Sequence, residues 1–139
     1  MEAILDSLSN HISSNAAFLG ERLLCERDTE EYRQLLAECY IQENKPHKAY
    51  YILKECKQDY AKYLLALAYF RCGKIKEAEK VLTSKNYIPN GAFGNYLLGL
   101  IYEKEVRFEE ARTQYTLALE INPTLWSAYE KLAKLGESI

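Results

Sequence analysis

Glycine and proline are scarce in this 139-residue sequence, which holds six glycines and three prolines, most of them where turns are expected. Long hydrophobic runs are also missing. The longest apolar stretches meet a charged or polar residue well before the roughly 20 positions that a membrane span needs. The first residues, Met1-Glu2-Ala3-Ile4, lack the basic start and the apolar core of a signal peptide. The sequence therefore gives no support for a membrane role.

An excess of charge of one sign is missing as well. Eighteen lysines and arginines face 20 acidic residues, which gives a net charge of −2, and the two signs are interspersed. This balance argues against a nucleic-acid-binding surface. The sequence contains no Ser/His/Asp set, no glycine-rich phosphate loop and no paired metal ligands. We therefore expect no enzyme activity, no catalytic residues and no cofactor.

The four cysteines form no metal or disulfide motif. They lie 14, 17 and 16 positions apart with no C-x-x-C pair, and neither His11 nor His47 is placed beside one of them. This spacing favours small core or helix-face residues of an intracellular protein over a zinc site or a disulfide framework. The cysteines are Cys25, Cys39, Cys56 and Cys72.

Residues 97–123 carry the motif that organises the chain. Elements of the form Leu-Gly-x-x-Tyr, Ala-x-x-x-Tyr and Asn-Pro occur there in the order and at the spacing of the tetratricopeptide repeat (TPR) pattern. Only the Trp of that pattern is missing, and Asn95 stands in its place. The motif predicts two antiparallel helices joined by a short turn.

Small residues recur at a fixed separation and extend this pattern upstream. Two helices joined by a tight turn pack closely only where bulky side chains are absent from the crossing. Three pairs of small residues are each 12 positions apart: Ala37 and Ala49, Ala66 and Ala78, Gly99 and Ala111. The recurrence predicts an all-α fold, a TPR-type α-solenoid of antiparallel helix pairs.

Apolar periodicity and turn residues set the expected boundaries. We expect one TPR domain over residues 1–139, the N-terminal part of a longer TPR protein. It would begin with a degenerate pair over 2–27 and continue with helix pairs over 30–57, 60–84 and 92–121. Thr29 or Asp28 is suited to cap the helix that starts near residue 30. A C-terminal capping helix is expected over 124–136.

The first helices of successive TPR pairs line a concave groove, and here several of the groove positions are apolar. Counted from the helix starts, the second and third full pairs place seven aromatic or leucine side chains in that groove. The core positions of these helices are already taken by other residues, such as Leu65 and Leu98. A contiguous apolar groove usually marks a protein interface. The seven residues are Tyr60, Tyr63, Leu67, Phe70, Phe93, Tyr96 and Leu100.

The N-terminal helix expected over residues 2–13 offers an apolar stripe that could fill such a groove. The stripe consists of Ile4, Leu5, Leu8 and Ile12. A terminal helix and a groove lie apart within one solenoid, so we expect them to meet between two copies in a closed, two-fold homodimer. The alternative is a TPR adaptor whose groove holds an apolar peptide segment of another protein.

Several segments also resemble one TPR family. These are residues 17–23, 48–50, 52–54 and 62–66, and above all Asn122-Pro123-Thr124-Leu125-Trp126-Ser127. They resemble the N-terminal region of the cell-division-cycle 27 family of anaphase-promoting-complex subunits, over nearly the whole chain.

The resemblance implies a scaffold subunit of a ubiquitin ligase that controls mitotic progression. Its partners would be a second copy of itself and other subunits of the anaphase-promoting complex, without nucleic acid or membrane, in the nucleus and cytoplasm. The family's N-terminal repeats form a homodimer, so the resemblance assigns dimerisation to the first helix and the groove. The first dozen residues resemble the family only in pattern.

Overall fold

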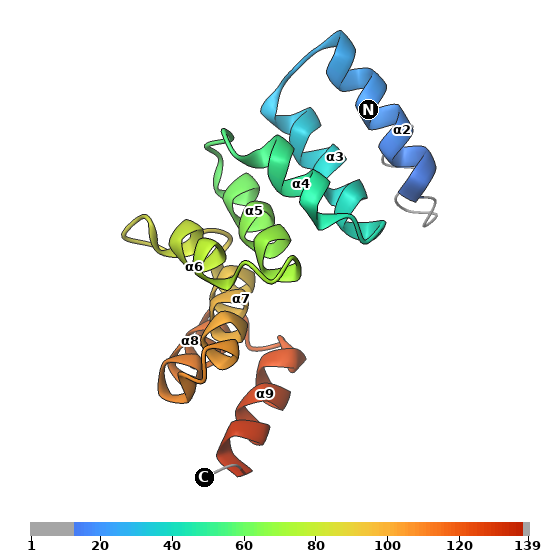
Figure 1. Ribbon diagram of the computed structural model, residues 1–139. Coiled ribbons are helices and arrows are strands. Elements are labelled where there is room, and N and C mark those ends of the chain that lie inside the picture. The colour runs from blue at the N-terminus through green and yellow to red at the C-terminus, as the bar shows by residue number, and fades with distance from the viewer. Residues whose placement is uncertain (1–12, 138–139) are drawn as a thin grey trace. The chain divides into compact units, whose positions relative to one another are not determined.

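The computed structural model describes residues 13–137, and every regular element in that range is a helix (Figure 1). This confirms the all-α class. Two compact units divide the chain between Lys74 and Ile75. The boundary falls inside the predicted pair 60–84, so the two helices of that pair belong to different units. That residues 1–139 form a single TPR domain stays a prediction.

Each unit contains four helices within the described range. The first holds α2 (Ser13–Glu26), α3 (Glu30–Gln42), α4 (Pro46–Leu53) and α5 (Asp59–Arg71). The second holds α6 (Ile75–Thr83), α7 (Gly91–Lys104), α8 (Phe108–Ile121) and α9 (Trp126–Glu137).

The start of α3 follows from its capping residue. The Oγ1 atom of Thr29 accepts a hydrogen bond from the backbone N–H of Tyr32 at 3.2 Å, which satisfies one of the free amides of the first turn. Asp28, the other expected cap, instead accepts two hydrogen bonds from the Arg33 guanidinium at 2.6 and 2.7 Å. Thr29 is therefore the N-cap.

Small residues allow the helices of the first unit to pack closely. In Figure 1, α2, α3 and α4 lie side by side in chain order. Ala37 on α3 and Ala49 on α4, the first predicted small pair, have no exposed surface. Gly20 plays a similar part on α2, since a Cβ atom there would lie 3.1 Å from Cδ1 of Leu36. The buried face of α3 is thus confirmed.

The helix after Pro46 is shorter than predicted, because α4 ends at Leu53 and not near Lys57. The N–H of Cys56 donates to the carbonyl oxygen of Leu53, three residues back, at 3.0 Å. The N–H of Lys57 donates to the Glu30 carboxylate. Both amides are used outside an α-helical ladder, and this ends the helix.

The second unit is built around the packing of α7 on α8. A Cβ atom on Gly99 would lie 2.4 Å from Cε1 of Tyr115, so the ring of Tyr115 fills the space that the glycine leaves. The sequence predicted that Gly99 faces Ala111; Ala111 is buried, but the residue against Gly99 comes one turn later on α8. The Tyr115 hydroxyl donates to the Glu103 carboxylate at 3.1 Å, so this buried ring keeps a polar partner.

The segment before α7 is a tight turn. Asn90 and Gly91 have φ angles of 65° and 53°, in the left-handed region that a glycine adopts without strain. A Cβ atom on Gly94 would lie 1.8 Å from the carbonyl oxygen of Pro89. Only a glycine therefore lets the turn fold back against the first turn of α7.

The C-terminal helix begins at Trp126, not at Thr124 as predicted. The side-chain Oδ1 of Asn122 accepts from the N–H of Thr124 at 3.2 Å and from its hydroxyl at 2.7 Å. This side-chain turn holds Thr124 outside the helix. Arg112 of α8 donates to the carbonyl oxygen of Leu135 at 3.0 Å and fastens α9 to α8.

Candidate protein-interaction surface

The predicted groove residues of α5 are partly exposed. Tyr60 is 39% exposed, and Tyr63, Leu67 and Phe70 are half-buried. Leu65 on the same helix is only 4% exposed, so α5 separates a buried core stripe from a second apolar stripe that this unit leaves partly open. The rings of Tyr60 and Tyr63 stack at 6.3 Å between centroids.

Polar contacts with α3 hold one edge of this stripe. The Tyr60 hydroxyl donates to the Glu38 carboxylate, and Gln34 Nε2 donates to Gln58 Oε1 at 2.5 Å. Desolvation of the phenol, together with the Glu38 carboxylate, raises the pKa of Tyr60. At neutral pH the Tyr60 hydroxyl is therefore a stable donor that fixes the ring.

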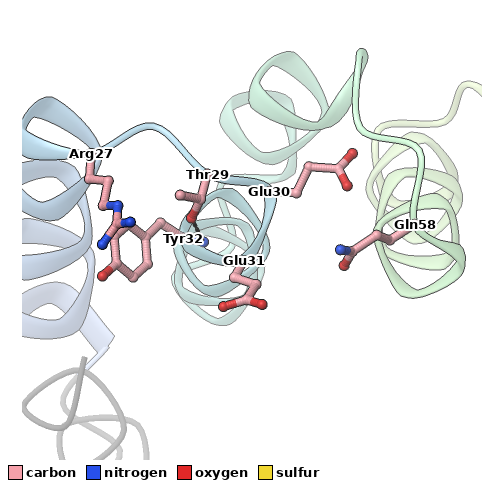
Figure 2. A pocket seen from close by; sticks show the side chains of 6 residues that line it. All are labelled: Arg27, Thr29, Glu30, Glu31, Tyr32 and Gln58. Carbon is pink, nitrogen blue, oxygen red and sulfur yellow. Dashed lines mark hydrogen bonds between the residues drawn. The ribbon is translucent and has the colours of Figure 1, made fainter.

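A polar pocket of about 500 Å³ lies at the start of α3, in the same unit. Figure 2 shows that the side chains of Glu30 and Gln58 extend toward each other from its two sides. Its lining residues are Arg27, Thr29, Glu30, Glu31, Tyr32 and Gln58.

The predicted groove residues of α7 show the same division within the second unit. Phe93 is 49% exposed, and Tyr96 and Leu100 are half-buried. Leu98 between them is 1% exposed. Tyr96 also packs against Tyr115, with ring centroids 5.6 Å apart, so part of its surface belongs to the unit's own core.

The predicted interface residues of the first helix lie outside the described residues. They are Ile4, Leu5, Leu8 and Ile12. Their contact with a groove stays a prediction.

Sequence analysis missed the most exposed aromatic residue of the first unit. Tyr51 on α4 is 75% exposed, the largest exposed fraction among the large hydrophobic side chains that the structure describes. A signal was present, since Tyr50 and Tyr51 are neighbours. Successive residues of a helix point about 100° apart, so two adjacent tyrosines rarely share one buried face.

The cysteines are all free: Cys39 and Cys56 are buried, Cys72 is half-buried and Cys25 is exposed. Burial raises the pKa of Cys39 from 9.0 to about 11, which makes it an unreactive thiol at neutral pH. Residues 13–137 hold no group of three or more His, Cys, Asp or Glu side chains placed to bind a metal ion. No helix in this range combines the length and the apolar character of a membrane span.

Comparison with known protein families gives two matches along the chain. The family described as "Anaphase-promoting complex, cyclosome, subunit 3" matches residues 9–85, more than half of the sequence. The tetratricopeptide repeat matches residues 94–125, where the organising motif was found.

Curated relatives cover nearly the whole chain. Cell division cycle protein 27 homolog B of Arabidopsis thaliana is 43% identical over 98% of this chain, and the cell division cycle protein 27 homolog of Homo sapiens is 34% identical over 97%. The chain spans only 20% and 18% of the lengths of these relatives.

Solved structures share the fold. The crystal structure of the APC/C hetero-tetramer Cut9–Hcn1 matches 93% of this chain and 27% of its own with a TM-score of 0.83 at 24% identity. The crystal structure of MamA matches 99% of this chain and 85% of its own with a TM-score of 0.80 at 20% identity. These likenesses confirm the TPR-type α-solenoid class. The family match and the relatives that cover nearly the whole chain confirm the resemblance to the cell-division-cycle 27 family. The chain belongs to the family of anaphase-promoting complex (cyclosome) subunit 3.

Proposed function

We propose that this chain is a non-catalytic scaffold module of the anaphase-promoting complex that brings two copies of its subunit together. Membership of the subunit 3 family supports the place in the complex. In each protomer the N-terminal helix would enter the apolar TPR groove of the other. The complex is a ubiquitin ligase, and its further subunits would be the other partners.

The observation that carries the dimer proposal is the second apolar stripe of α5 and of α7. Each of these helices has a buried core stripe and keeps a partly exposed set of aromatic and leucine side chains beside it. Transfer of such surface out of water is favourable by about 25 cal/mol per Å². A helix with an apolar face is a suitable cover, because it satisfies its own backbone hydrogen bonds and presents side chains only.

The stoichiometry of the proposal follows from symmetry. One predicted groove and one predicted apolar N-terminal helix per protomer would give two equivalent contacts in a closed pair. A heterologous adaptor would instead need a partner to supply the helix. The two functions therefore differ in the mass of the purified chain alone.

The test is the molar mass of the chain in solution, measured by light scattering on a size-exclusion column. The dimer has about twice the chain mass of 16.1 kDa. Phe93→Glu places a charge in the predicted groove and should give the monomer mass with unchanged helical circular dichroism. Phe108→Glu is the matched control, because Phe108 is 44% exposed against 49% for Phe93 and lies on α8, outside the predicted groove.

Leu8→Glu tests the other half of the contact. It should also give the monomer mass while the helical signal stays. A wild-type monomer at tens of micromolar would contradict dimerisation and favour the adaptor. Loss of the helical signal in Leu8→Glu would mean that this residue belongs to the protein's own core.

A further inference from the structure

A surface rich in tyrosine and lysine lies on α4 and its neighbours in the first unit. We call it the tyrosine–lysine face. Its aromatic residues come from α3, α4 and α5, and the Tyr50 and Tyr69 rings are in contact, with centroids 5.0 Å apart. The face consists of Tyr40, Tyr50, Tyr51, Tyr69, Lys48, Lys54 and Lys74.

The three lysines of this face lie over tyrosine rings. Lys48 Nζ is 5.5 Å from the centroid of the Tyr40 ring. Lys54 Nζ lies 5.5 Å from the Tyr50 centroid and 5.9 Å from the Tyr51 centroid. Lys74 Nζ lies 5.1 Å from the Tyr50 centroid. At these distances the ring quadrupole holds the ammonium without neutralising its charge.

No carboxylate of residues 13–137 forms an ion pair with Lys48, Lys54 or Lys74. The acidic groups that lie near Tyr40 already have partners. The Glu21 carboxylate accepts a hydrogen bond from the Tyr40 hydroxyl, and the Glu43 carboxylate forms an ion pair with Lys45. The face therefore keeps three positive charges in a chain whose net charge is −2.

A hollow of about 370 Å³ opens within this face. Three tyrosine side chains and Ile52 give it an apolar lining, and His47 and Lys48 are its basic residues. That volume is large enough for one aromatic or leucine side chain of a partner. The lining residues are Tyr40, His47, Lys48, Tyr50, Tyr51 and Ile52.

We propose that the tyrosine–lysine face binds an acidic segment of a partner protein that inserts one apolar side chain into the hollow. Charge complementarity selects this occupant, because carboxylates can reach lysine ammonium groups that have no acidic partner among residues 13–137. The hollow supplies the desolvated anchor point, since Tyr residues beside an apolar pocket are typical of interface hot spots. A basic segment would instead meet like charge.

The test is binding of a fluorescein-labelled peptide to the full 139-residue chain, measured by fluorescence anisotropy. The probe has glutamates on both sides of a single central tryptophan. One control peptide carries lysines in place of the glutamates, and another carries alanine in place of the tryptophan. Binding should be seen for the probe, should weaken for both control peptides, and should fall as salt is raised, because exposed charges are screened.

Variants of the protein locate the site. Lys54→Glu and Tyr51→Ala should each weaken binding of the probe about fivefold. Lys85→Glu and Tyr87→Ala are the matched controls, because this pair also places an ammonium near a tyrosine ring, at 5.6 Å, but lies on the other unit and does not line the hollow. Both controls should bind as the wild type does.

Three results would overturn the proposal. The first is no binding of the probe to the wild type at low salt. The second is an equal effect of Lys54→Glu and Lys85→Glu, which would mean non-specific attraction. The third is loss of the dimer mass in Lys54→Glu, which would mean that a second copy of the chain covers this face.

Discussion

Replacement of Gly99 by alanine probes the closest approach between α7 and α8. The added Cβ atom would lie 2.4, 2.7 and 2.9 Å from three atoms of the Tyr115 ring. Ordinary carbon contacts begin at 3.4 Å, so the ring has to retreat by about 1 Å. Tyr115 has no exposed surface and its hydroxyl is bound to Glu103, which leaves the ring no free direction.

The expected loss is about 2 kcal/mol of unfolding free energy. Overpacking of a filled core costs roughly 1–3 kcal/mol, and weakening of the hydrogen bond from Tyr115 to a charged carboxylate adds about 1 kcal/mol or more. The higher helix propensity of alanine offsets this by about 1 kcal/mol of unfolding free energy. The sum corresponds to a fall of about 6 °C in Tm for a domain of this size.

Urea unfolding followed by circular dichroism measures this loss. Gly136→Ala is the matched control, since a Cβ atom there meets nothing within 4 Å and the residue also lies in a helix. It should be neutral or stabilising. In a Tyr115→Leu background, where the ring is gone, Gly99→Ala should cost less than about 1 kcal/mol.

Two outcomes would refute this packing argument. One is a Gly99→Ala variant as stable as Gly136→Ala. The other is an equal cost of Gly99→Ala with and without the Tyr115 ring, because the loss would then have another cause.

Two further predictions concern the first unit. Thr29→Ala removes the hydrogen bond to the N–H of Tyr32 and should lower the unfolding free energy by about 1 kcal/mol in urea titrations; an unchanged midpoint would contradict the cap. Burial raises the pKa of Cys39 above its unfolded value of 9.0, to about 11, so the stability due to its protonated thiol is fully present below pH 9 and is lost as the pH rises to 11. Wild type should therefore lose about 2 kcal/mol more than Cys39→Ala between pH 8 and 10.5, and equal losses would contradict the assignment.

The repeat architecture could be predicted because it depends on residue size at fixed spacing. Every alanine of the three small pairs is completely buried, which the 12-residue separation alone indicates. The start of a helix could also be predicted where a side chain caps the first turn, as Thr29 does for α3. These are local properties, and the sequence contains them directly.

The C-terminal end of α4 and the start of α9 could not be read from apolar periodicity in the same way. The end of α4 depends on the Glu30 carboxylate, which is remote in sequence from Lys57. The start of α9 depends on a local turn in which the Asn122 side chain accepts from Thr124; the sequence contains this signal, but apolar periodicity does not detect it. The partner of Gly99 likewise depends on how far α8 slides along α7. The spacing predicts that the two helices cross near Gly99. It does not predict that the ring of Tyr115 is the group that packs against Gly99.

The groove residues show a similar limit. Periodicity separated the stripe of Tyr60 and Phe93 from the core stripe of Leu65 and Leu98, and the exposed fractions agree with that division. Periodicity does not say what covers a partly exposed stripe. Periodicity did not predict the tyrosine–lysine face, because the residues of that surface come from three helices and surround one exposed ring, Tyr51.

The central claim is that a second copy of the chain covers the apolar stripes of α5 and α7. Sedimentation equilibrium of the wild-type chain over a concentration series tests it most directly. We predict a single species of about twice 16.1 kDa that dissociates only on dilution. A constant mass of one chain up to tens of micromolar would contradict the claim.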